Sequence, residues 1–244
     1  MEPLSQTKEN AFPCPAWVFS NNSNVHVAKD RCWFGDDYTP IESFVTDMLG
    51  NSIKVVGMGT VNLPTHISPT QTGPDSHGNV CLKNVLHAPT VICDIIGRPI
   101  LHDYEVNLGD QREHSGFITN SCDGSPTAYF KPSSATVGFL EVQLSEPPSG
   151  PELGPSPFDS SALYMIHAFW PDSERTRIAG LLTSRQTKAK HVGPPTSAEK
   201  AWLKTHYGNE FKFLRSHGLR IYNKKERAEG RSIIRDMMSK DGMD

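Results

Sequence analysis

The feature that most constrains this chain is an early strand pattern interrupted by a run of small polar residues. Trp17 and Phe19 alternate along an apolar stretch near the N-terminus. The pattern resumes at Val25 and Val27, after the polar run Ser20–Asn24. Alternation with a period of two is typical of a half-buried strand. Because Asn and Ser side chains bond neighbouring backbone groups, the polar run predicts a tight turn between a strand and a return strand.

The chain as far as about residue 145 continues with short apolar runs separated by turn residues. Gly and Pro number 19 each among 244 residues, and hydrophobic residues make up 36%. Such a turn-rich composition favours β structure over helical bundles. Short strands with turn signals between them predict a small barrel or a sandwich.

Several local motifs in this region match one known family. Trp17 and His26 stand at the same spacing as a Trp and a His of that family. Gly57–Val61 and Val85–Pro89 match two further motifs. The region resembles the protease-region β-barrel of copia-type retrotransposon Pol polyproteins, which is retropepsin-like. The resemblance covers roughly residues 16–145, and it implies a mainly β fold built on a small retropepsin-like β-barrel.

The position of the family's catalytic Asp is occupied by Ser20, which is followed by Asn21 and Asn22. An aspartic protease needs two carboxylates that share one proton, so that one activates water while the other donates. A Ser hydroxyl can serve as neither. The family's Asp-Thr/Ser-Gly triplet is also absent from the whole sequence, since Asp123–Ser125 has the wrong order. We therefore expect that the chain is not an active aspartic protease.

Prolines and helix signals divide the rest of the chain. Five prolines between residues 147 and 157 predict a linker. A capping box from Thr196 to Glu199 and a cap at Asn223 predict a C-terminal α-helical pair. The expected organisation is a tail over 1–15, the β-barrel over 16–145, a Pro-rich linker over 146–160, a returning strand segment over 161–184 and a basic helical extension over 185–244.

Charge is distributed unevenly along the chain. Residues 185–240 carry 14 Lys and Arg against 5 Asp and Glu, whereas residues 1–184 carry 10 against 20. Blocks of opposite charge can attract each other, and a basic helical face is more often solvated than bound to nucleic acid. We therefore do not expect a nucleic-acid partner.

Residues 1–11 are polar, and no apolar run approaches the roughly 20 residues of a membrane span. These features predict a cytoplasmic protein without a membrane partner. Five cysteines without a Cys-x-x-Cys pair indicate reduced thiols. The spacing of the His and Cys residues matches no compact zinc pattern, so we expect neither a metal nor a cofactor.

The candidate site residues are polar and aromatic side chains on the turn and on the strands around it. Imidazole and carboxyl groups are suited to general acid–base work, whereas aromatic and amide groups are suited to holding a ligand. The alternative for each imidazole is a bond to a backbone carbonyl, and for the carboxyl it is a bond to backbone amides. The predicted catalytic residues are His26, His87 and Asp94, and the predicted ligand-binding residues are Trp17, Ser20, Asn22, Asn24 and Trp33.

Two function classes follow from these residues. In the first, a protease-dead barrel binds a small molecule and catalyses a cofactor-independent cyclisation or isomerisation by holding one reactive conformer. In the second, the protein is a non-catalytic scaffold, a homodimeric pseudoprotease whose basic tail binds a protein or nucleic-acid partner. The first is the leading hypothesis, because a polar turn and two histidines lie among aromatic strands, and the second is the alternative.

Overall fold

The structure is a computed structural model that describes residues 12–109, 115–132, 139–159, 161–190 and 195–240. The chain divides into two compact units, Met1–Glu174 and Arg175–Asp244. The division falls inside helix α1 (Asp172–Lys190). Of the expected tail, residues 1–11 lie outside the described residues.

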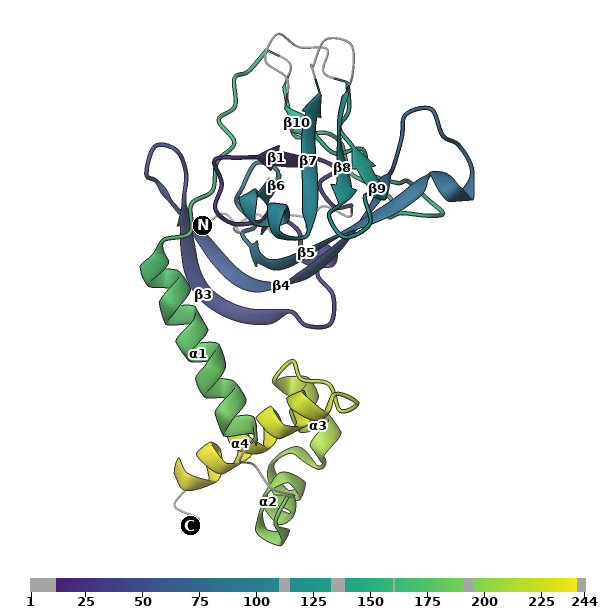
Figure 1. Cartoon of the computed structure of the whole chain (residues 1–244). Coiled ribbons are helices and arrows are strands. Elements are labelled where there is room, and N and C mark those ends of the chain that lie inside the picture. Colours follow the sequence, from purple (N-terminus) through teal and green to yellow (C-terminus); the bar gives the residue numbers. More distant parts are fainter. Residues whose placement is uncertain (1–11, 110–114, 133–138, 160, 191–194, 241–244) are drawn as a thin grey trace, which may run out of the picture. The chain divides into compact units, whose positions relative to one another are not determined.

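A seven-stranded sheet in the first unit brings together strands that are distant in the sequence (Figure 1). Its order is β10 (Leu140–Glu141), β1 (Trp17–Ser20), β6 (Asp94–Gly97), β2 (Val27–Ala28), β5 (His77–His87), β4 (Ser52–His66) and β3 (Thr39–Thr46). β1 pairs with β6 in parallel, and β2 pairs in parallel with β5. The return strand expected after the turn is therefore not paired with the strand before it. The fully buried strand β6 lies between them, because its apolar side chains require a central place in the sheet.

Leu49–Asn51 between Phe44–Met48 and Ser52–Val56 predicts a hairpin from the sequence, and the structure confirms it as the connection of β3 and β4. The Asp47 carboxylate accepts the backbone N–H groups of Leu49 and Asn51 at 2.9 and 2.8 Å. Gly50 adopts a φ of 83°, which residues with a Cβ rarely adopt. β4 then continues to His66 and pairs with β5, which gives the sheet its two longest strands.

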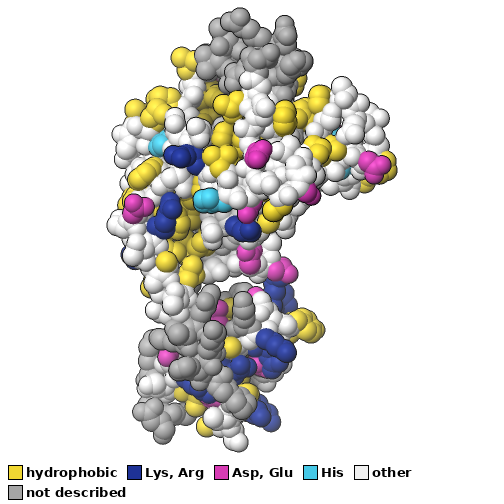
Figure 2. Space-filling view, in the orientation of Figure 1, with side chains coloured by type: hydrophobic (Ala, Val, Ile, Leu, Met, Phe, Trp, Pro, Cys, Tyr) yellow, Lys and Arg dark blue, Asp and Glu magenta, His cyan; other side chains and the backbone are white. Residues whose placement is uncertain are grey.

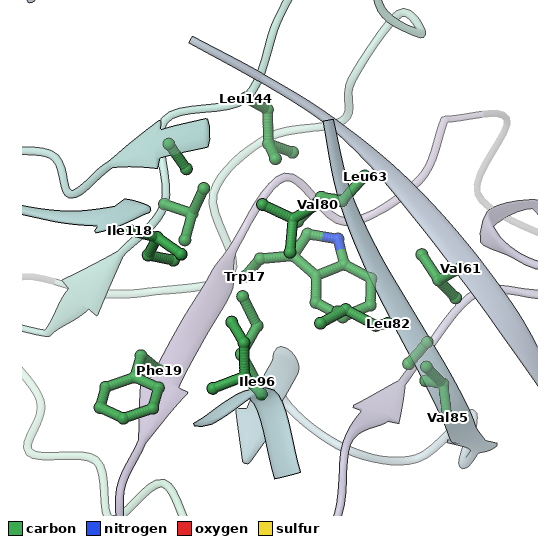
Figure 3. Packing of buried hydrophobic residues seen from close by; sticks show 14 of the residues in the cluster. Trp17, Phe19, Val61, Leu63, Val80, Leu82, Val85, Ile96, Ile118 and Leu144 are labelled. Carbon is green, nitrogen blue, oxygen red and sulfur yellow. The ribbon is translucent and has the colours of Figure 1, made fainter. Parts of the chain in front are cut away.

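A smaller sheet of β7 (Tyr104–Gly109), β8 (Ser115–Asn120) and β9 (Pro126–Tyr129) runs across the direction of β4 and β5 (Figure 1). The core takes side chains from both sheets. Trp17 is fully buried there, among Val80, Leu82 and Leu144 (Figure 3). Burying one such apolar side chain contributes about 1.5–3 kcal/mol, so this cluster is the main source of stability in the first unit.

The first unit is sheet-rich, as the mainly β prediction requires, but the whole chain is a mixed structure with four helices among the described residues. The ladders of the described residues form two sheets rather than one closed barrel. In the larger sheet, β10 and β3 lie at opposite ends of the order, joined to the rest by β1 and β4 respectively.

The returning strand segment expected over 161–184 is wrong for most of its length. Only Phe169 makes a β-bridge, to Thr46 at the end of β3. Helix α1 begins at Asp172 and occupies the rest of the segment. Asp172 and Glu174 place two carboxylates in its first turn, where the helix dipole favours negative charge. Ala179, Leu181 and Leu182 are good helix formers and favour the helix as well, whereas Gly180 between them does not.

The second unit contains α2 (Ser197–Tyr207), α3 (Glu210–Ser216) and α4 (Lys224–Lys240), so the predicted helical pair is an underestimate. The predicted capping box at Thr196 is present. Gly208, with a φ of 79°, and the N-cap Asn209 end one helix and begin the next. Their shared core consists of Trp202, Leu203, Phe213, Leu214, Ile234 and Met238. None of the helices among the described residues is both long enough and apolar enough to cross a bilayer.

Candidate functional site

The turn that follows β1 is built on its own serine hydroxyls. The backbone N–H of Ser23 donates to the carbonyl of Ser20 at 3.0 Å, which closes the turn. The Ser23 hydroxyl donates to the Ser20 hydroxyl at 2.9 Å. Both serines are buried, whereas Asn21 and Asn22 are exposed. The turn therefore presents a small cluster of hydrogen-bonding groups on one side and solvated amides on the other.

A segment 146 residues later in the sequence lies on this cluster. We call residues 166–170 the covering segment. The Ser20 hydroxyl donates to the Ile166 carbonyl at 2.9 Å, and the Ala168 N–H donates to the Ser23 hydroxyl at 2.9 Å. The backbone N–H of Asn24 donates to the Ala168 carbonyl at 3.2 Å. The turn thus recognises the backbone of the covering segment rather than its side chains.

Asn24 bonds the end of the covering segment in the way that a neighbouring strand would. Its Nδ2 donates to the Trp170 carbonyl at 2.9 Å, and its Oδ1 accepts the Trp170 N–H at 2.7 Å. An Asn amide can mimic a peptide group because it carries one acceptor and a donor at the same spacing. One side chain therefore satisfies both backbone groups of a residue that is only 6% exposed.

The other edge of the covering segment bonds to β3. Phe169 exchanges backbone hydrogen bonds with Thr46 at 2.8 and 2.9 Å. The Trp170 indole N–H donates to the Ser43 hydroxyl at 3.0 Å, and that hydroxyl donates to Glu174 at 2.7 Å. Ala168 is fully buried while the Phe169 side chain is 42% exposed. Such alternation is that of an extended peptide whose third and fifth residues, Ala168 and Trp170, point inward.

Ser20 cannot perform the chemistry of the carboxylate that the resemblance places there. Its hydroxyl is already used twice, as a donor to Ile166 and as an acceptor from Ser23. Among the described residues, no hydrogen bond joins two carboxyl groups. The site therefore holds a peptide backbone with neutral hydroxyl and amide groups and lacks an acid–base pair at the turn.

His26, predicted as catalytic, is a buried acceptor that supports the turn. Its side chain is 3% exposed, and its Nδ1 accepts the Gly97 N–H at 3.1 Å. Burial, with a smaller contribution from His102, lowers the pKa of His26 to about 4. A neutral imidazole is therefore held in place at neutral pH. Gly97 must be a glycine here, because a Cβ would lie 2.2 Å from the Val25 carbonyl oxygen.

His87, the last residue of β5, belongs to an aromatic cluster with Phe34 and Tyr38, which lie in the segment before β3. Its Nδ1 lies 2.9 Å from the Tyr38 hydroxyl, and Phe34 packs against both rings. Burial lowers the pKa of His87, and a hydrogen bond to the backbone of Lys29 opposes that shift. The bond to Tyr38 and the packing of Phe34 hold the imidazole in one orientation. The Arg31 guanidinium lies 3.8 Å from the centre of the Tyr38 ring and closes the cluster.

Asp94 is fully buried, and one of its oxygens accepts the Lys29 N–H at 2.6 Å. Burial raises the pKa of this carboxyl well above its usual value, and the Lys29 bond opposes the shift. The Trp33 indole also lowers this pKa, although Trp33 Nε1 and Asp94 Oδ2 do not meet hydrogen-bond geometry. The Trp33 indole and the Asp94 carboxyl therefore make a polar contact and not a hydrogen bond. Asp94 bonds the backbone of Lys29, whereas His87 bonds Tyr38, and the described hydrogen bonds of Ser20 involve neither of them.

The other predicted ligand-binding residues, Trp17, Trp33 and Asn22, lie outside the contact with the covering segment. Trp17 and Trp33 are buried in the core, with their rings edge to face at 5.7 Å. Asn22 is exposed. Of the predicted set, the structure joins Ser20 and Asn24 in one site and leaves the three predicted catalytic side chains outside it. Among the described residues, no group of three or more His, Cys, Asp or Glu side chains could hold a metal ion.

Sequence reasoning predicted that the segment after residue 160 returns to the β structure, but it did not assign the residues that complete the site. Ser43, Ala168 and Trp170 have no motif around them, and the covering segment follows a proline-rich stretch that predicts a linker. The one available signal was the apolar character of the residues from Ala162 to Trp170. Comparison of the chain with protein-family models, with curated proteins and with solved structures finds no match.

Proposed function

We propose that the first unit is a non-catalytic peptide-binding module, derived from a retropepsin-like barrel whose protease activity is lost. The supporting observation is that the N–H and C=O groups from Ala168 to Trp170, together with the Ile166 carbonyl, bond to the turn and to β3. Main-chain bonding of this kind is how sheet edges bind extended peptides. In this chain the bound peptide is its own covering segment.

The same contacts define which peptides would bind. Ala168 is fully buried and Trp170 is nearly so, so the surface takes a small residue followed two positions later by an aromatic one. The indole N–H adds a bond to Ser43 that a phenyl ring cannot make. Phe169 is partly exposed, so its position tolerates other side chains. The chemical class of partner is an extended peptide with a small-x-Trp pattern.

This proposal is favoured over a small-molecule cyclase or isomerase by how the candidate residues are used. Trp17 and Trp33 are core residues, and His26 accepts a backbone N–H with a pKa of about 4. Asp94 accepts another backbone N–H. A small-molecule site needs polar groups that converge on a ligand. These groups bond the protein's own backbone instead.

The proposal is tested by emptying the surface and offering the peptide in trans. The full chain carrying Ala168→Arg and Trp170→Ala has a covering segment that no longer fits. We expect this variant to bind a fluorescein-labelled peptide of residues 161–172 in a saturable manner, measured by fluorescence anisotropy. The unsubstituted chain should bind it far more weakly, because a tethered segment competes at an effective concentration on the order of millimolar.

Two controls make the result specific. The labelled peptide with the same two substitutions should not bind, and a chain with Phe169→Ala should behave like the unsubstituted one because its backbone bonds remain. Circular dichroism establishes that each variant is folded. A folded, emptied variant that ignores the peptide, or that binds the substituted peptide equally well, would refute peptide recognition.

A further inference from the structure

The second unit contains a hollow of about 440 Å³ between α2, the start of α3 and α4. Leu203 and Ile234 form part of its wall and belong to the helical core. Four basic side chains also line it, as two pairs spaced four residues apart on two packed helices. The pairs are Lys200 with Lys204 on α2, and Arg227 with Arg231 on α4. The remaining lining residues are Pro195, Gly208, Asn209 and Glu210.

Basic pairs at this spacing are unfavourable unless something compensates their charge. Residues four apart on a helix are neighbours, and like charges there repel. Glu210 compensates Arg227, since its two oxygens accept from Nε at 3.0 Å and from Nη2 at 2.7 Å. For Lys200, Lys204 and Arg231, the described part of the chain supplies no ion pair. Three positive charges around one hollow therefore have no ion-pair partner among the described residues.

Arg231 supplies an independent sign of a missing partner. Its Nε is buried and has no hydrogen-bond partner among the described residues. Buried polar atoms without partners are rare, because each has lost its bonds to water, and one that lines a hollow is suited to bond a ligand that enters it. A guanidinium also has the planar fork of donors that suits phosphate oxygens, which an ammonium group lacks.

We propose that this hollow binds the phosphate group of a small phosphorylated molecule of about nucleotide size. Arg231 would donate to the phosphate oxygens, and Lys200 and Lys204 would supply charge. The apolar wall at Leu203 and Ile234 would contact the organic part, and a volume of about 440 Å³ lies in the usual range for small-molecule sites. Figure 2 shows several Lys and Arg side chains gathered on the visible face of the helical unit, which would also draw an anion towards it. This inference is independent of the peptide proposal, because Arg175–Asp244 is a separate compact unit.

The test is isothermal titration of the full chain with ADP, with pyrophosphate and with a single-stranded 12-nucleotide DNA. We expect saturable binding of ADP and weaker binding of pyrophosphate. Arg231→Gln and Lys204→Gln should each weaken ADP binding by about tenfold or more, the usual effect of losing one charge-assisted hydrogen bond. Arg215→Gln is the matched control, because Arg215 is an exposed cation on α3 that does not line the hollow.

Each possible outcome decides the matter. If Arg231→Gln unfolds the helices, Lys204→Gln still tests the site, because Lys204 is exposed and its loss removes no packing. An unchanged ADP affinity in a folded Lys204→Gln variant would overturn the proposal. So would an equal loss in Arg215→Gln, which would indicate attraction to net charge alone. Binding of the oligonucleotide without binding of ADP would assign the surface to nucleic acid instead.

Discussion

The contact between Asn24 and Trp170 gives the sharpest prediction about the covering segment. Asn24→Ala removes two hydrogen bonds, of 2.9 and 2.7 Å, and leaves both backbone groups of a nearly buried residue without these partners. A net loss of about 1 kcal/mol per bond, with a further penalty for the unsatisfied groups, gives about 2–4 kcal/mol. The lower figure corresponds to about thirtyfold more frequent opening of the segment.

Amide hydrogen exchange measures this opening directly. The reporters are the N–H groups of Ala168 and Phe169, whose acceptors Ser23 and Thr46 are not substituted. We expect both amides to exchange about thirtyfold faster or more in Asn24→Ala. Asn22→Ala is the matched control, since it removes the same type of side chain from the exposed side of the same turn. Equal exchange at Ala168 and Phe169 in the two variants would show that Asn24 does not hold the segment, and the reasoning would be wrong.

The other predictions concern pH and backbone space. Burial raises the pKa of Asp94 above its ordinary 3.8, so the folded state binds this proton more tightly than the unfolded state does. The free energy of unfolding therefore falls as the pH rises from the ordinary pKa to the raised one, by at most about 1.4 kcal/mol per pH unit. Asp94→Asn keeps an acceptor for Lys29 and should be more stable than the unsubstituted chain at pH 7, with a difference in urea unfolding that shrinks towards pH 4; a difference independent of pH would contradict this assignment. Gly97→Ala places a Cβ 2.2 Å from a backbone oxygen, so it should lower the free energy of unfolding by about 2 kcal/mol or more. Gly180→Ala in helix α1 meets no atom within 4 Å, so it should raise the free energy of unfolding by up to about 1 kcal/mol. Equal thermal shifts for the two alanine variants would refute the close approach at Gly97.

Local signals were sufficient for many elements of this chain. The turn at Ser20–Asn24, the hairpin at Asp47–Asn51 and the capping box at Thr196 are each present where the sequence predicts them. Each depends on hydrogen bonds between residues at most four positions apart, so the residues that decide it are adjacent in the sequence. The difference between Ser20 and the catalytic Asp that the resemblance places there is likewise a property of one position, so it can be recognised without a structure.

Tertiary contacts decided the rest. The pattern of apolar residues gives the strands of β1, β2 and β6, but it cannot say that β6 lies between the other two. Nor can it reveal that Ser20 and Asn24 bond a segment 146 residues away, because a polar turn offers the same groups to water or to any backbone that reaches it. The charges of Lys204 and Arg231 are visible in the sequence, and only the packing of α2 against α4 brings them to one hollow. Which distant strands pair depends on the total apolar surface that the whole chain buries. A local stretch of sequence does not contain that information.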